Sequence, residues 1–249
     1  MFKEKFKTNS AVICSWLQIP APSIAEIAAQ QGIDWIAVDM EHTEISYETL
    51  ADIFRALNGS KTSPLVRVRT NNALDIRRAL DVGAEGIIVP LVHSAEEAER
   101  AVSYCKYPPE GVRGYAFCRA NNWGDDFDNY VKEANHKTAV YVMAESREAV
   151  ENIESILKVE GIDGVFIGPY DLSASYGVVG QTGHSLVKKG CDIILEACKA
   201  HGKIAGIHMV IPDENAVREN IEKGFRLIAV GIDTLFLING FKEVKKLGE

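Results

Sequence analysis

The sequence lacks the features of a membrane protein and of a nucleic-acid-binding protein. None of its apolar runs approaches the roughly 20 residues that span a bilayer, and the charged segment 1–7 has no apolar core or cleavage site of a signal peptide. Acidic residues outnumber basic ones by 35 to 27, whereas nucleic acids and anionic membranes favour basic surfaces. We therefore expect a cytoplasmic protein that acts on small molecules, with no nucleic-acid or membrane partner.

Cysteine is scarce, and its pattern excludes a disulfide framework. The five cysteines are odd in number and show no CxxC spacing, which is typical of reduced thiols in a cytosolic protein. The chain also has no Ser- or Pro-rich linker and no internal repeat beyond an alternation of short apolar runs and amphipathic segments. We therefore expect one domain over residues 1–249.

That alternation predicts the fold. Eight short apolar runs read as strands, at 11–17, 35–38, 64–67, 86–89, 139–143, 164–167, 203–207 and 226–230. Helical patterns separate them, with Ser46 and Ser94 as expected N-caps and further helices over 146–157, 186–201 and 212–223. The pattern favours a closed (β/α)₈ barrel, and a doubly wound open sheet is the second possibility.

One connection is unusually long. Residues 106–127 carry Pro108-Pro109 and several aromatic side chains. A connection of this length is usually functional or mobile, and the alternative is a surface loop packed by its own aromatics.

Ionisable residues appear abruptly where the second strand ends. The apolar run 35–38 is followed by Asp39, Glu41 and His42. In a barrel, residues at the carboxyl ends of strands converge on one face, where active sites form. We expect Asp39 to orient the imidazole of His42 so that one ring nitrogen is free to handle a proton. The alternative is a strand that ends in an ordinary solvated loop.

Two acids at later strand ends are candidates for a metal site. Glu145 follows the fifth strand and Asp171 follows the sixth, and two carboxylates with few soft ligands nearby suit Mg²⁺ or Mn²⁺. Each could instead be a rim acid paired with a lysine or arginine. Arg67 lies within an apolar run, so its guanidinium needs an anionic partner. Other polar residues at strand ends are His208 and Asp233.

Residues 168–171 lead from the sixth strand into a short helix. Their free backbone N–H groups are candidates for binding a substrate carboxylate.

Four segments together resemble the HpcH/HpaI aldolase family. They are 38–42 (VDMEH), 66–67 (VR), 107–114 (YPPEGVRG) and 161–173 (GIDGVFIGPYDLS), and the similarity extends from about residue 11 to about residue 237. These are class II, metal-dependent pyruvate aldolases, which include enzymes acting on 4-hydroxy-2-oxoheptanedioate and 2-dehydro-3-deoxyglucarate. The resemblance implies a barrel of the phosphoenolpyruvate/pyruvate type and a carbon–carbon lyase of the aldehyde-lyase class. Such an enzyme cleaves a 4-hydroxy-2-oxo acid reversibly to pyruvate and an aldehyde through a metal-stabilised enolate.

The resemblance also implies roles for particular residues. Glu145 and Asp171 would bind Mg²⁺ or Mn²⁺, with Co²⁺ as a further possibility, and Arg67 would stabilise the enolate oxygen. His42, oriented by Asp39, would take the proton of the C4 hydroxyl through a metal-bound water. The remaining implied roles concern substrate and subunit contacts: Trp16 as a pocket aromatic, Tyr170 and Asp171 in the carboxylate cradle, and Asp81 at a neighbouring subunit's site.

Family relatives assemble as hexamers, so the resemblance implies a homo-hexamer (a trimer of dimers) whose C-terminal helix packs on a neighbouring subunit. Two positions depart from the family pattern. Met143 stands where many relatives have Gln, and Tyr170 stands where many have a small residue. We expect both to line the substrate pocket and to alter which aldehyde is accepted. The alternatives to an aldolase are another lyase or decarboxylase acting on a 2-oxo acid, and a barrel that binds a ligand without turnover.

Overall fold

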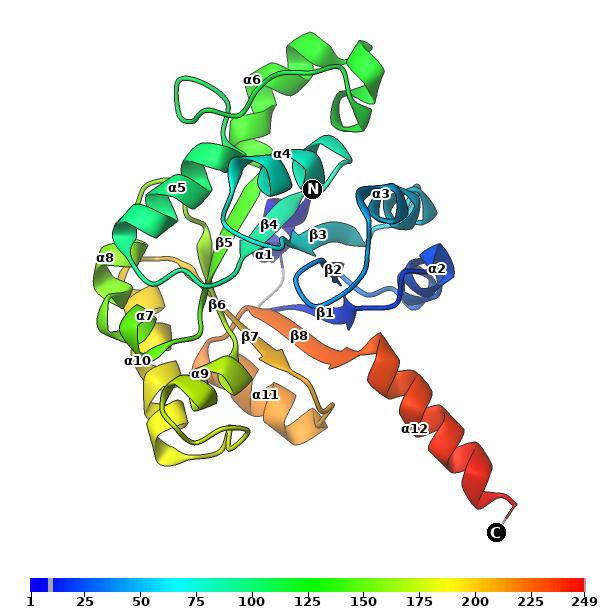
Figure 1. Ribbon diagram of the computed structural model, residues 1–249, viewed down its shortest axis with the longest axis vertical. Coiled ribbons are helices and arrows are strands. Elements are labelled where there is room, and N and C mark those ends of the chain that lie inside the picture. The colour runs from blue at the N-terminus through cyan, green and yellow to red at the C-terminus, as the bar shows by residue number, and fades with distance from the viewer. Residues whose placement is uncertain (9–10, 249) are drawn as a thin grey trace.

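The chain forms a closed barrel of eight parallel strands in a computed structural model that describes residues 1–8 and 11–248. The strands pair in chain order and the last pairs with the first, so the sheet has no open edge (Figure 1). They are β1 (Val12–Leu17), β2 (Trp35–Asp39), β3 (Ser63–Arg67), β4 (Gly86–Val89), β5 (Ala139–Ala144), β6 (Gly164–Ile167), β7 (Ile204–Met209) and β8 (Leu227–Ile232). The predicted (β/α)₈ barrel is confirmed, and the open sheet is excluded.

Helices connect the strands and surround the barrel (Figure 1). They are η1 (Phe2–Glu4), α1 (Lys5–Thr8), α2 (Pro22–Gln30), α3 (Tyr47–Ala56), α4 (Ala73–Asp81), α5 (Ala95–Cys105), η2 (Arg119–Gly124), α6 (Phe127–Lys137), α7 (Arg147–Glu151), α8 (Ile153–Leu157), α9 (Pro169–Ser175), α10 (Ser185–Ala200), α11 (Glu214–Lys223) and α12 (Asp233–Lys246). Ser46 and Ser94 cap α3 and α5 as predicted, because each hydroxyl accepts a hydrogen bond from a backbone N–H of the first turn.

The side chains of each strand alternate between two apolar layers, one inside the barrel and one between the barrel and the helices. In β2, Trp35 and Ala37 belong to the cluster that fills the barrel, whereas Ile36 and Val38 pack against the helices outside. The filling depends on close approach between strands: a Cβ on Gly206 would lie 2.5 Å from the ring of Phe166. Because the interior is packed with side chains, chemistry is confined to the mouth of the barrel.

The N-terminal helical turn closes the opposite end of the barrel. Phe2 is fully buried and lies against Trp35 and Tyr141, with ring centroids 5.8 and 6.1 Å away. The backbone N–H of Phe2 donates to Glu85 Oε2 at 2.6 Å. This charged segment therefore has a packing role that its composition does not reveal.

The connection at 106–127 is a loop that is packed by its own aromatic side chains and then enters η2. Tyr107 and Tyr115 stack with ring centroids 4.3 Å apart, and Phe117 meets Phe127 edge-on. These contacts match the predicted alternative of a surface loop that is packed by its own aromatic side chains. Helix α6, which follows the loop, was not predicted from the sequence.

Two other elements differ from the sequence expectation. The helix expected over 146–157 is broken into α7 and α8 at Asn152, whose side-chain amide donates to the carbonyl of His93. Strand β7 extends to Met209, so His208 lies inside the strand rather than after it.

The last helix, α12, projects away from the barrel (Figure 1). Its exposed side chains include large apolar ones: Phe236, Leu237, Ile238, Phe241 and Val244. Among the described residues, no helix is both long enough and apolar enough to cross a membrane.

Candidate active site

The polar residues predicted at the strand ends lie together at the mouth of the barrel. A cavity of about 150 Å³ opens there. It is lined by Trp16, Gln18, His42, Arg67, Met143, Gly168, Pro169, Tyr170, Asp171, His208, Val210 and Ile232. These residues come from seven of the eight strands or from the segments that follow them, as expected for a barrel active site.

Arg67 is fixed at this mouth by two acids of the neighbouring β2 segment. Its Nε and Nη2 atoms donate to the two carboxylate oxygens of Asp39 at 3.0 and 2.6 Å, and Nη1 lies 3.1 Å from Glu41 Oε2. Burial by itself lowers the pKa of Arg67, but the neighbouring carboxylates, Asp39 foremost, raise it overall. The site thus holds a permanently charged guanidinium in one orientation.

Asp39 is fully buried, and its carboxylate accepts more than the Arg67 bonds. Gln18 Nε2 donates to it at 3.2 Å, as do the backbone N–H groups of Glu41 and His42. Burial tends to raise the pKa of Asp39, but the hydrogen bonds and charge of Arg67 bring it below its usual value. The carboxylate is therefore ionised.

The structure corrects the expected relation between Asp39 and His42. The Asp39 carboxylate is bonded to Arg67, and it contacts His42 through the backbone N–H at 3.3 Å rather than through the ring. The His42 side chain is 60% exposed, with Nε2 lying 3.7 Å from Glu41 Oε2. The imidazole faces the cavity from an open position, where solvent reaches it.

Glu145 is a buried acid in a negatively charged neighbourhood. It is 4% exposed, and burial raises its pKa to about 7, although the Leu91 N–H donates to Oε1 at 2.9 Å. The negative charges of Asp171 and Glu41 raise the pKa of Glu145 further. Leu91 adopts a φ of 53° to present its N–H, a backbone conformation that non-glycine residues rarely adopt.

This group of acids suits a hard divalent cation. Its donors are carboxylate oxygens, and Arg67 is already shared with Asp39 and Glu41, which leaves Glu145 and Asp171 short of positive charge. Within residues 1–8 and 11–248, no three His, Cys, Asp or Glu side chains converge as a ready-made metal cage. A cation held by two carboxylates would therefore keep positions for water and substrate oxygens.

Gly168 makes room for the Glu145 carboxylate. A Cβ at this position would lie 2.8 Å from Glu145 Oε2 and 3.2 Å from Met143 Cε. Gly168 also precedes α9, whose first turn contains Tyr170 and Asp171. Residues 168–171 line the cavity, and the carboxylate cradle formed by backbone N–H groups of this turn remains a prediction.

The two departures from the family pattern, Met143 and Tyr170, both line the cavity. Met143 is buried beneath it, and Tyr170 is partly exposed at its rim. Trp16 lies within β1 and contacts the Arg67 guanidinium, whose Cζ atom is 5.1 Å from the ring centroid.

Asp81 lies elsewhere in its own chain. It ends α4 and forms an ion pair with Arg113 at 2.8 Å. Because α4 leads into the first residues of β4, Asp81 is near the end of the barrel opposite to its own cavity. A contribution to a neighbouring subunit's site stays a prediction.

Two further residues of the site have no role predicted from the sequence. Gln18 bonds to Asp39, and His208 stacks on Trp16 with ring centroids 4.7 Å apart. Both follow from position in the barrel: Gln18 comes directly after β1, and His208 occupies an inward position of β7. Asp233 has a bracing role, since its carboxylate accepts the backbone N–H groups of Gln18 and Ile19.

As a whole, the barrel mouth combines a fixed guanidinium, the buried acid Glu145, the exposed acid Asp171 and an accessible imidazole. A guanidinium and a cation site side by side can stabilise negative charge that develops on a substrate oxygen. The imidazole can exchange a proton with a group in the cavity. This arrangement suits the cleavage or formation of a bond next to a carbonyl group.

Comparisons with known proteins agree on one family. Residues 13–240 match the family described as HpcH/HpaI aldolase/citrate lyase. The chain is 36% identical to a hydroxypyruvate/pyruvate aldolase of Roseobacter denitrificans, over 98% of this chain and 94% of that protein. It is 39% identical to a 4-hydroxy-2-oxo-heptane-1,7-dioate aldolase of Salmonella arizonae, over 96% of this chain and 90% of that protein. The crystal structure of an HpcH/HpaI aldolase/citrate lyase family protein from Burkholderia cenocepacia has a TM-score of 0.93, with 32% identity and coverage of 99% and 98%.

Proposed function

Because the chain belongs to the HpcH/HpaI aldolase/citrate lyase family, we propose that its barrel mouth is the active site of a divalent-metal-dependent aldolase. The enzyme is a carbon–carbon lyase that reversibly cleaves a 4-hydroxy-2-oxo acid to pyruvate and an aldehyde. The observation that carries the assignment of this site is the fixed Arg67 guanidinium beside the buried acid Glu145.

Arg67 supplies positive charge where the reaction needs it. Cleavage of the bond between C3 and C4 leaves negative charge on the 2-oxo group of the pyruvate fragment, which becomes an enolate. The guanidinium is already oriented by Asp39 and Glu41, so little reorganisation is needed as that charge develops. Removal of one such preorganised donor typically costs about 10²–10³ in rate.

Glu145 and Asp171 would hold the divalent cation, with Mg²⁺ or Mn²⁺ as the best match to their carboxylate oxygens and Co²⁺ as a further possibility. When bound, such a cation supplies a Lewis acid beside the 2-oxo group. Gly168 keeps the Glu145 carboxylate in place by leaving space against Oε2. The N–H groups at the start of α9 would orient the substrate carboxylate.

His42 would exchange the proton of the C4 hydroxyl group. Its exposed imidazole can deliver this proton to solvent and recover it in the synthetic direction. Asp39 acts on it only through the backbone N–H, so Asp39 is a positioning residue for Arg67 and for the 41–42 segment.

We further propose a homo-oligomer, specifically a hexamer built as a trimer of dimers. The support in this chain is α12, which carries five large apolar side chains in exposed positions, among them Phe241 at 71% exposure. A helix of this kind is expected to be covered by another subunit. We place the enzyme in the cytoplasm, in keeping with five cysteines that are all free.

The site can be tested by measuring proton exchange in pyruvate, which forms one half of the substrate. Purified protein with Mn²⁺ or Mg²⁺ should exchange the methyl protons of pyruvate for deuterium, as followed by NMR. Glu145→Ala should abolish the exchange, while Glu160→Ala, at an exposed acid outside the cavity, should leave it intact. Absence of exchange with every divalent metal would contradict the aldolase, and exchange unaffected by Glu145→Ala would contradict the metal ligand.

A further inference from the structure

The imidazole of His208 is held in one orientation at the edge of the cavity. It stacks on Trp16 with an interplanar angle of 19°, and Nε2 lies 3.2 Å from the carbonyl oxygen of Gly231. A carbonyl oxygen only accepts, so Nε2 carries the proton and donates it. Burial lowers the pKa of His208 to about 4, and the nearby Arg67 charge acts in the same direction. The ring is therefore neutral at physiological pH.

A neutral ring protonated at Nε2 has a lone pair at Nδ1. In the part of the chain that the structure describes, Nε2 alone of the two ring nitrogens has a hydrogen-bond partner, and Nδ1 is not among the buried polar atoms that lack one. Nδ1 is therefore open to the space around the ring. It can accept a hydrogen bond, and it cannot donate one.

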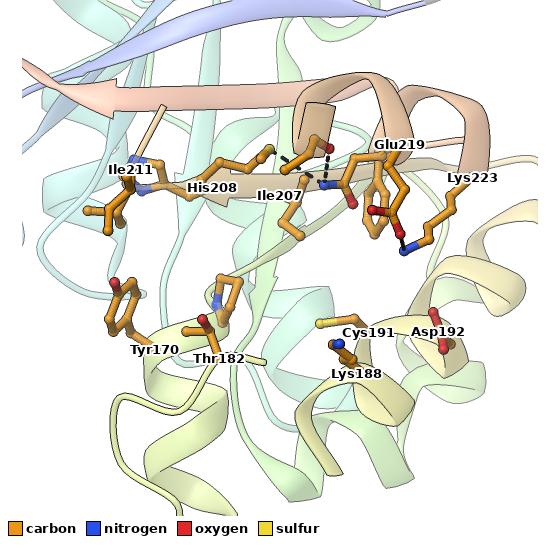
Figure 2. Close-up of a pocket in the computed structure, with 16 residues that line it drawn as sticks. Tyr170, Thr182, Lys188, Cys191, Asp192, Ile207, His208, Ile211, Glu219 and Lys223 are labelled. Carbon is orange, nitrogen blue, oxygen red and sulfur yellow. Dashed lines mark hydrogen bonds and ion pairs between the residues drawn. The ribbon is translucent and has the colours of Figure 1, made fainter. Parts of the chain in front are cut away.

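The space beside His208 is large enough for a substrate group. His208 and Tyr170 line the reaction cavity, and they also line an adjoining cavity of about 600 Å³ between α10 and α11. Figure 2 shows them on facing sides at one end of this second cavity, with the Glu219–Lys223 ion pair at the other end. A substituent that extends from the reacting carbons toward β7 passes His208.

We propose that His208 is a specificity-determining residue whose Nδ1 atom accepts a hydrogen bond from a hydroxyl group of the substrate. A hydroxyl group can donate to this atom, whereas a carboxylate oxygen would be repelled by it and a methyl group would leave it unpaired. The enzyme then favours a hydroxylated substrate over its deoxy analogue. This inference rests on the proposed aldolase function.

The hydroxyl group can belong to the 2-oxo acid half or to the aldehyde half of the substrate. Two pairs of reactions distinguish these two cases. Hydroxypyruvate against pyruvate, with one fixed aldehyde, tests the 2-oxo acid half. Glycolaldehyde against acetaldehyde, with pyruvate, tests the aldehyde half. The measured quantity is the ratio of kcat/KM for the hydroxylated compound to that for the deoxy compound. Within one variant this ratio cancels general losses of activity, which a merely structural role would cause.

Two substitutions distinguish the contribution of the Nδ1 acceptor from the contribution of the stacked ring. His208→Phe keeps an aromatic ring against Trp16 and removes the acceptor, whereas His208→Asn places an amide oxygen near the Nδ1 position and removes the stacking ring. We expect the ratio to fall about tenfold in His208→Phe for one of the two pairs, which corresponds to one hydrogen bond of about 1.4 kcal/mol. His208→Asn should keep most of the ratio. The matched control is His201→Phe, at a histidine paired with Glu154 outside both cavities.

The outcomes are distinct. An unchanged ratio for both pairs in His208→Phe would overturn the proposal, as would an equal fall in the Phe and Asn variants. If His208→Phe does not fold, His208→Leu provides a smaller side chain that also lacks an acceptor. Wild-type protein that exchanges no pyruvate protons would contradict the aldolase function itself, whereas active wild-type protein with unchanged ratios would contradict only the role of His208.

Discussion

Arg67 and Asp39 meet in a two-bond ion pair, with Nε 3.0 Å from Oδ1 and Nη2 2.6 Å from Oδ2. The two residues are register partners on adjacent strands, so the barrel itself aligns the planar guanidinium with the carboxylate.

This geometry predicts that charge alone is insufficient at position 67. Arg67→Lys keeps the charge but cannot form the two parallel bonds or reach Glu41 at the same time. We expect kcat to fall about 10²–10³-fold, as measured by pyruvate release. Arg69→Lys, close by but bonded to the Ile45 carbonyl and outside the cavity, should change kcat less than about threefold. Near-normal turnover by Arg67→Lys would contradict the assigned role.

The stability of the metal-free protein should depend on pH through Glu145. Burial raises the pKa of this group to about 7 from its usual 4.5, so the folded state binds the proton more tightly than the unfolded state does. The free energy of unfolding should therefore fall as pH rises from about 4.5 to about 7, by about 3 kcal/mol from this residue. Urea unfolding in EDTA at pH 5 and pH 8 measures the change.

The Glu145→Gln variant provides the comparison, because it cannot ionise. Its unfolding free energy should fall less between pH 5 and pH 8 than that of the wild type. Mn²⁺ should raise the stability of the wild type more at pH 8 than at pH 5, since the cation competes with the proton. Equal pH dependence of the two proteins would exclude a raised pKa at Glu145.

We predict that metal binding requires a residue without a side chain at position 168. The added methyl group of Gly168→Ala would lie 2.8 Å from Glu145 Oε2 and must displace the carboxylate. We expect Mn²⁺ affinity, measured by calorimetry, to fall at least about tenfold, given how steeply metal binding depends on ligand placement. Gly183→Ala is the matched control, because nothing lies within 4 Å of its added Cβ. Equal affinities in the two variants would show that the carboxylate has room to move.

The apolar side chains of α12 should control assembly. Phe241 is 71% exposed on a helix that projects from the barrel. Phe241→Asp should place a charge in the subunit contact and shift the mass measured by light scattering toward smaller species. Lys242→Asp changes the charge of the same helix at the next exposed position and should leave the mass unaltered. A wild-type protein that is monomeric at micromolar concentration would contradict the proposed hexamer.

The barrel was predictable because burial on both faces leaves a continuous apolar run in each strand. The run 35–38 is one such case, and Ser46 and Ser94 mark helix starts through local hydrogen bonds. The break at Asn152 was not predictable from local pattern, and the side chain of Asn152 bonds to the carbonyl of His93, which is distant in sequence. Helix α6 was not predicted, because it directly follows the aromatic-rich connection at 106–127.

The residues of the site were easier to predict than their partners. Arg67 ends β3, Glu145 directly follows β5, and Asp171 lies in the first turn of α9 after β6, so all three are placed at the expected mouth. The partner of Asp39 was not visible in local spacing, which pointed to His42 nearby in the sequence. The alignment of β2 with β3 decides the matter, since it sets Arg67 directly opposite.

The Asp233 carboxylate has a consequence for the order in which the protein matures. It accepts the backbone N–H groups of Gln18 and Ile19 at 3.0 and 2.9 Å, and Gln18 in turn donates to Asp39. A residue near the end of the chain thus fixes a segment near its beginning, which borders the cavity. During synthesis from the N-terminus, the pocket is complete only after Asp233 has left the ribosome. Catalytic activity therefore reports that the entire barrel has closed.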